Sequence, residues 1–131
     1  MRFLLDTHVL VEWFEESSRL GPRHAALLQS ADVGHPLWVS DISLWEVANL
    51  VGLGRIEIGI PLRDWLERST APPLVRRIGI SPVVAAEVAA LPDTLHRDPA
   101  DRIIIACARV LGATVLTRDR RIIESGLVQI A

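Results

Sequence analysis

The chain has 131 residues, half of them apolar, with a formal net charge of −2 and a positive mean hydropathy. This composition can bury a substantial core, which excludes a disordered segment and predicts a single domain over residues 1–131. All 14 basic residues are arginines, so P-loop and receiver-domain chemistry, which need a lysine, are excluded. No run of about 18 apolar residues and no signal peptide is present, so we expect a cytoplasmic protein without a membrane span.

The first half of the chain is expected to alternate two short strands with three helices. Apolar segments of four or five residues predict strands at 2–5 and 36–40. Helices are predicted at 8–17, 22–31 and 42–54. Ser40 or Asp41 is suited to cap the third of these helices, and a glycine ends it.

The second half continues the alternation. Helices are predicted at 61–69, 82–91, 98–112 and 119–126. Strands are predicted at 74–80, 113–117 and 127–130. Cys107, the single cysteine, lies inside an apolar helical run and is read as a buried structural thiol. Strands that alternate with helices in this way favour an α/β sandwich with a largely parallel sheet.

Two aspartates directly follow predicted strands. Asp6 comes after the first strand, and Asp119 comes shortly after the strand at 113–117. In an open parallel sheet, ligands bind beyond the carboxyl ends of the strands, which is where these carboxylates would lie. A helix N-cap is a sufficient explanation for either residue taken alone.

The stretch at 95–108 carries two more aspartates. Asp98 stands just before a proline and is therefore expected to cap the helix that follows. Asp101 falls at the third helical position, on the same inward face as Ile105. Arg102 and Arg109 are expected to look outward. Asp98 thus has a structural role, whereas capping does not explain Asp101.

Glu46 lies opposite the main apolar stripe of its predicted helix, where a solvated glutamate is the ordinary interpretation. The helix is apolar on most sides, however, so a second buried face would turn Glu46 toward the crevice. Four carboxylates that converge without basic partners would repel one another, and a divalent cation removes that repulsion. Oxygen ligands suit Mg²⁺ or Mn²⁺, and the absence of a His/Cys cluster argues against zinc. Such sites activate water for attack on a phosphodiester.

Four blocks of the sequence resemble the signature blocks of PIN-domain proteins, most closely the bacterial toxins of the VapC type. They are "LLDTHVLVEW", "SDISLWEVANLVGLGRI", "HRDPADRIIIACA" and "ATVLTRDRRI", and their order and spacing extend over nearly the whole chain. The resemblance implies a three-layer α/β/α sandwich with a mainly parallel sheet. It also implies an endoribonuclease toxin that depends on Mg²⁺ or Mn²⁺, forms a homodimer and is inhibited by a cognate antitoxin.

Matched by position, the resemblance assigns metal binding and catalysis to Asp6, Glu46, Asp101 and Asp119. It adds possible accessory residues, which are Thr7, Thr117 and Asp98. Asp98 belongs to an HRDPxDR version of the third block and is read as a cap first and as an outer-shell acid second. One departure is that arginines surround Asp119, where the family often has an asparagine nearby.

Five arginines near the acidic blocks are candidates for binding the RNA backbone: Arg97, Arg102, Arg118, Arg120 and Arg121. A solvated surface charge is the equal alternative for each. Single-stranded or looped RNA is the expected substrate, because an A-form duplex hides its bases. Trp13 is a candidate anchor for a protein partner, with burial in the core as the alternative.

Two rival interpretations remain. A strand-end aspartate is also found in aspartyl-phosphate enzymes, but those of the haloacid dehalogenase type have a second acid where this chain has His8. A catalytically inactive PIN-fold module that acts by binding a protein or RNA partner is compatible with every feature above.

Overall fold

The structure is a computed structural model that describes all residues, 1–131. Each strand and helix predicted from the sequence is present, in most cases with shorter ends. The strands are β1 Phe3–Leu5, β2 Leu37–Ser40, β3 Val75–Ile78, β4 Thr114–Leu116 and β5 Gln129–Ile130. The helices are α1 Thr7–Phe14, α2 Pro22–Gln29, α3 Asp41–Gly52, α4 Leu62–Ser69, α5 Pro82–Ala90, α6 Pro99–Leu111 and α7 Arg120–Ser125.

The five strands form one sheet in the order β3-β2-β1-β4-β5, and all neighbours are parallel. Leu5 at the end of β1 pairs with Val39 of β2 on one side and with Leu116 of β4 on the other. The carboxyl ends of the three central strands are therefore level. Residues that follow these strands emerge at one common edge of the sheet.

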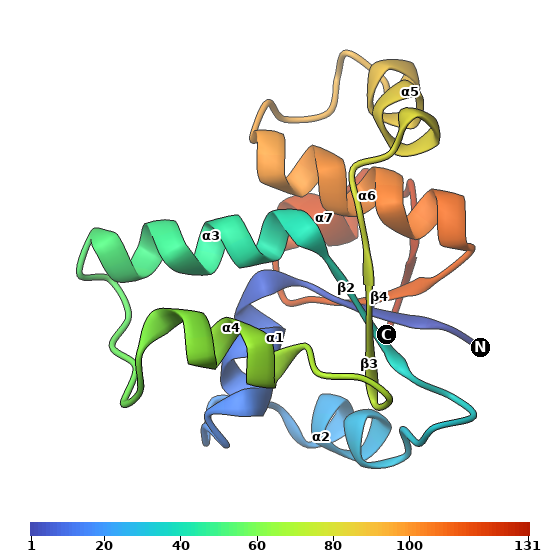
Figure 1. Cartoon of the computed structure of the whole chain (residues 1–131). Helices are drawn as coiled ribbons and strands as arrows, with labels where there is room; N and C mark the ends of the chain where they lie inside the picture. The colour runs from blue at the N-terminus through green and yellow to red at the C-terminus, as the bar shows by residue number, and fades with distance from the viewer.

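Helices cover both faces of the sheet, which confirms the predicted α/β/α sandwich (Figure 1). α1, α2 and α4 lie on one side, and α5, α6 and α7 lie on the other. α3 packs against both α1 and α6 and so lies near the edge where the central strands end. Right-handed crossovers through helices are the usual way to join parallel strands.

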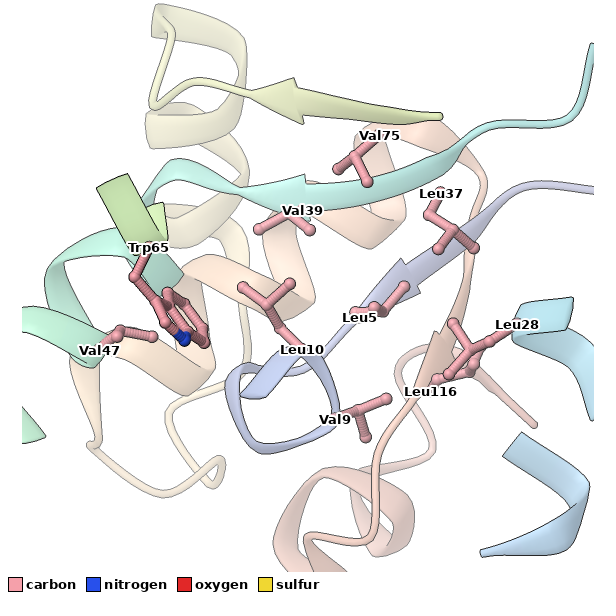
Figure 2. Packing of buried hydrophobic residues seen from close by; sticks show 10 residues of the cluster. All are labelled: Leu5, Val9, Leu10, Leu28, Leu37, Val39, Val47, Trp65, Val75 and Leu116. Carbon is pink, nitrogen blue, oxygen red and sulfur yellow. The ribbon is translucent and has the colours of Figure 1, made fainter. Parts of the chain in front are cut away.

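Each face of the sheet has its own hydrophobic core, because side chains alternate along a strand. Leu5 points into the core shared with α1, α2 and α4, whereas its neighbour Leu4 points into the core shared with α5 and α6. Figure 2 shows the first core, in which the Trp65 ring of α4 packs beside Val47 and Leu10. Both leucines of β1 are fully buried, so neither face of the central strand meets solvent.

Two smaller predictions are settled by burial. Trp13 is partly buried and packs against the first core, which supports a core role over that of an exposed anchor. The most exposed tryptophan is Trp45. Cys107 is buried as predicted, and its Sγ donates to Ser40 Oγ at 3.4 Å. None of the helices has both the length and the apolar character that a membrane span requires.

Candidate active site

Asp6 and Asp119 lie at the carboxyl edge of the sheet, after β1 and β4 respectively. Asp6 is only 4% exposed, and its Oδ1 accepts a hydrogen bond from the backbone N–H of Thr7 at 2.8 Å. Asp119 caps α7 through a bond from the N–H of Arg121 at 2.9 Å. Both aspartates therefore serve as N-caps, but an aspartate is rarely buried as fully as Asp6 unless it has a specific partner. The near-complete burial of Asp6 goes beyond what capping requires.

Thr117 connects these two aspartates. Its hydroxyl donates to Asp6 Oδ2 at 2.7 Å and accepts from the backbone N–H of Asp119 at 3.0 Å. The side chain is 2% exposed, so both bonds are shielded from water. Thr117 therefore fixes the orientation of the Asp6 carboxylate and its position relative to the turn that carries Asp119.

Glu46 reaches the same edge from α3. Its Oε1 accepts a hydrogen bond from the hydroxyl of Thr7, which also lies 2.9 Å from Ser43 Oγ. Thr7 is the residue after Asp6, so this contact ties Glu46 to the end of β1. Of the two interpretations of Glu46, the structure supports the one in which it faces the crevice, because the residue is half-buried and bonded inward.

Asp98 caps α6, as predicted from the proline that follows it. Its Oδ1 accepts a hydrogen bond from the backbone N–H of Asp101 at 3.0 Å. Asp101 itself is 6% exposed, in the first turn of the helix. The helix dipole favours an anion at this end, and the cap holds the backbone that carries Asp101.

The expectation that these acids lack basic partners is wrong. His96 Nε2 lies 2.7 Å from Asp101 Oδ2. Arg121 Nη2 lies 3.3 Å from the same oxygen and 3.3 Å from Asp119 Oδ2. His96 was not predicted as a partner of Asp101, although it precedes Asp101 by only five residues. Asp101 is thus held by two basic groups of the chain itself.

Burial and the like charges of the neighbouring acids shift the pKa values of these carboxyl groups. Burial raises the pKa of the Asp6 carboxyl, and the like charge of Asp119 adds to it. Burial also raises the pKa values of Glu46 and Asp101, and each feels repulsion from Asp6 and Asp98. Partial burial opposes ionisation of Asp119 too, but its contacts with Arg121 outweigh this and lower its pKa. Three of the four acids therefore carry unfavourable negative charge.

The predicted RNA-binding arginines differ in their surroundings, and the outward orientation expected for Arg102 is wrong. Arg102 is 8% exposed, and its Nη1 donates to the backbone carbonyls of Leu95 at 3.0 Å and His96 at 3.2 Å. It supports the loop that carries His96 and is not available to RNA. Arg118 is exposed, but its guanidinium is bonded to Glu12 and to the carbonyl of Arg19.

The other three predicted arginines are exposed as well. Arg97 and Arg120 are exposed and make only i,i+4 contacts, at 4.0 Å with Asp93 and 3.5 Å with Glu124. The Arg121 side chain is 58% exposed while it contacts the acids.

The acids fit a hard divalent cation in their chemistry, since they offer carboxylate oxygens under mutual repulsion. In this arrangement, however, no group of three or more His, Cys, Asp or Glu side chains forms a ready metal site. Thr7, Thr117, His96 and Arg121 contact some of the carboxylate oxygens, but Glu46 Oε2 and Asp101 Oδ1 take part in no hydrogen bond. The acids would therefore have to move closer together to share a cation.

Comparison with known proteins identifies the class to which this fold and site belong. The PIN domain family matches residues 3–126, so the chain belongs to the PIN domain family. It is 40% identical over 119 residues to Ribonuclease VapC22 of Mycobacterium tuberculosis strain H37Rv, an alignment that covers 91% of this chain and 88% of the relative.

Two solved structures have the same fold. FitAcB from Neisseria gonorrhoeae is 26% identical with a TM-score of 0.70, over 98% of this chain and 95% of that one. A toxin–antitoxin complex from Klebsiella pneumoniae contains a chain 23% identical with a TM-score of 0.63, over 98% of this chain and 94% of that one.

Proposed function

We propose that the chain is a metal-dependent endoribonuclease and the toxin of a toxin–antitoxin pair, hydrolysing RNA phosphodiester bonds. The observation that carries the proposal is the convergence of Asp6, Glu46, Asp101 and Asp119 at one edge of the sheet, three of them with raised pKa values. The likeness to a ribonuclease over most of both chains supports the choice of RNA as substrate.

The four acids would hold Mg²⁺ or Mn²⁺. When bound, such a cation supplies activation of water and stabilisation of negative charge on the phosphate. Thr7 and Thr117 hold the carboxylates of Glu46 and Asp6 in place.

Accessible arginines at the same edge are suited to bind the backbone of single-stranded RNA, since a guanidinium pairs with phosphate through two hydrogen bonds. They are Arg97, Arg120 and Arg121.

The proposal includes a cognate antitoxin, a homodimer and action in the cytoplasm. The antitoxin is suggested by the resemblance to VapC-type toxins, and a chain of this fold is held in a toxin–antitoxin complex from Klebsiella pneumoniae. A basic side chain of such a partner that reached the carboxylates would prevent metal binding.

One observation favours the alternative of an inactive binding module. His96 and Arg121 of the chain itself contact the Asp101 carboxylate, and the acids do not form a ready metal site. In that case the acids would be retained without a cation, and a partner would recognise the same edge of the sheet.

Cleavage of a labelled mixed RNA pool separates the two functions. The purified protein is incubated with Mg²⁺, Mn²⁺ or EDTA beside an Asp101→Asn variant and an Asp93→Asn control, which makes the same chemical change on a side chain that is 97% exposed. We expect metal-dependent cuts with the wild type and the control, and only the EDTA background with Asp101→Asn. Equal residual cutting by all three folded proteins would reject the nuclease and leave the binding module.

A further inference from the structure

A second concave surface adjoins the acidic edge. It is a cavity of about 490 Å³ between one side of α3 and the first turn of α6, and its lining includes Glu46 and Asp98. Figure 1 shows the start of α6 beside α3, which extends away from the sheet. The volume falls in the range typical of small-molecule sites, about 300–1,000 Å³. Because the cavity shares Glu46 with the candidate active site, a ligand bound across the acids would continue into it.

The remaining lining suits a flat, uncharged group with polar edges. Trp45 is 60% exposed and forms one wall, and the apolar side chains of Ile42 and Leu50 line the cavity with it. The amide of Asn49 provides a donor and an acceptor, one turn further along α3 on the same face as Trp45. Proteins bind unpaired bases by stacking them on exposed aromatic side chains and by hydrogen bonds from polar groups to the base edges. Trp45 and the Asn49 amide provide both kinds of group.

The charges of the cavity distinguish a base from a phosphate. Glu46 and Asp98 would repel a phosphate group that entered it, whereas a neutral base meets no such penalty. Arg55, which also lines the cavity, is exposed and makes no ion pair with an acid. It is therefore free to bind the backbone of the same nucleotide.

We propose that this cavity binds one base of single-stranded RNA next to the scissile phosphate, with the base stacked on Trp45. The inference rests on the proposed function, because it takes RNA as the substrate of the acidic edge. It identifies Trp45, Asn49 and Arg55 as residues that determine which nucleotide is placed beside the cut. The shared wall at Glu46 favours a nucleotide of the substrate over a separate protein ligand.

Binding of short single-stranded RNA tests the proposal without catalysis. Fluorescence titrations use Asp6→Asn protein, which cannot cleave if the proposed function holds. This protein is compared with two double variants, which carry Trp45→Ala or Trp45→Phe in addition to Asp6→Asn. Leu53→Ala is the matched control, since Leu53 is 59% exposed and lies outside the cavity. Loss of one stacked base should weaken Kd roughly 5- to 150-fold for Trp45→Ala. We expect a smaller loss for Trp45→Phe and none for Leu53→Ala.

An oligonucleotide with one abasic position, moved along the strand, gives a second readout. For the protein that keeps Trp45, the RNA that is abasic at one particular position should have a weaker Kd than the unmodified RNA. For the Trp45→Ala protein, the same two RNAs should have equal Kd values. Equal affinities of the two proteins for every RNA would overturn the inference and assign the surface to another partner.

Cleavage distinguishes this failure from failure of the proposed function. If the wild type cuts RNA and Trp45→Ala cuts the same positions with the same KM, the base pocket is wrong and the nuclease stands. If the wild type never cuts RNA with Mg²⁺ or Mn²⁺, the nuclease itself is wrong, and the pocket is then overturned as a substrate site.

Discussion

Replacing Asp98 tests whether this acid caps α6 or acts on the substrate. In Asp98→Ala the backbone N–H of Asp101 loses its 3.0 Å hydrogen bond to the Asp98 carboxylate. Loss of an N-cap costs about 1 kcal/mol in the free energy of unfolding, which corresponds to roughly 3–5 °C in Tm for a domain of this size. The first turn of α6 also carries Asp101, so a frayed turn should lower the rate of RNA cleavage.

Asp98→Ser is compared with Asp98→Ala, because serine keeps the N-cap and removes the charge. We expect its stability to stay within about 0.5 kcal/mol of the wild type, with cleavage retained. Ser81→Ala removes the cap of α5, where Ser81 accepts from the N–H of Val84 at 3.4 Å, and should lower stability while cleavage is kept. Urea unfolding and kcat/KM on one RNA measure both effects. If Asp98→Ser cleaved as poorly as Asp101→Asn, the charge of Asp98 would be required and the cap explanation refuted.

Two further predictions concern the buried charges. Burial raises the folded-state pKa of Asp6 above its unfolded value near 3.8, so between these pKa values the folded state binds more protons and stability falls as pH rises. Asp6→Asn should therefore have a higher free energy of unfolding in urea than the wild type at pH 7 in EDTA. As pH falls toward 4, the stability of the wild type should rise more than that of Asp6→Asn. A variant that is less stable than the wild type at pH 7 would contradict this. Arg102→Met should lose about 2–4 kcal/mol in urea unfolding, because the carbonyls of Leu95 and His96 lose charged donors in a buried site, whereas Arg97→Ala on the surface should change stability by less than about 0.5 kcal/mol.

The fold could be predicted from the sequence because local signals and the sheet pattern agree. Pro82 and Pro99 stand at the first positions of α5 and α6, and Gly112 ends α6 with φ +64°. The three central strands, β1, β2 and β4, are largely buried on both faces, as expected in a parallel sheet covered by helices, whereas the edge strands β3 and β5 expose part of their residues. These sequence features depend only on neighbours in the chain and on the alternation of elements. They can therefore be recognised without knowledge of distant contacts.

The position of the acids could also be predicted, since the ends of parallel strands meet at one edge of the sheet. This rule places Asp6 and Asp119 at that edge, and the inward position of Asp101 on α6 was predicted from helical periodicity. Glu46 required the position of α3 relative to α1, which no local pattern contains. The contacts of Thr7 and Thr117 with these carboxylates depend on side-chain orientation and became visible only in the structure.

The error at Arg102 and the omission of His96 have one cause, the path of the loop that precedes α6. Helical periodicity placed Arg102 on the face opposite the core, but the face of a helix is exposed only if nothing covers it. The loop folds back so that the carbonyls of Leu95 and His96 meet the guanidinium, and the same fold brings the His96 ring to Asp101. The arginine and the histidine therefore depend on each other's placement. A pattern read along one helix could not show either, because both arise from a contact between the helix and its own leading loop.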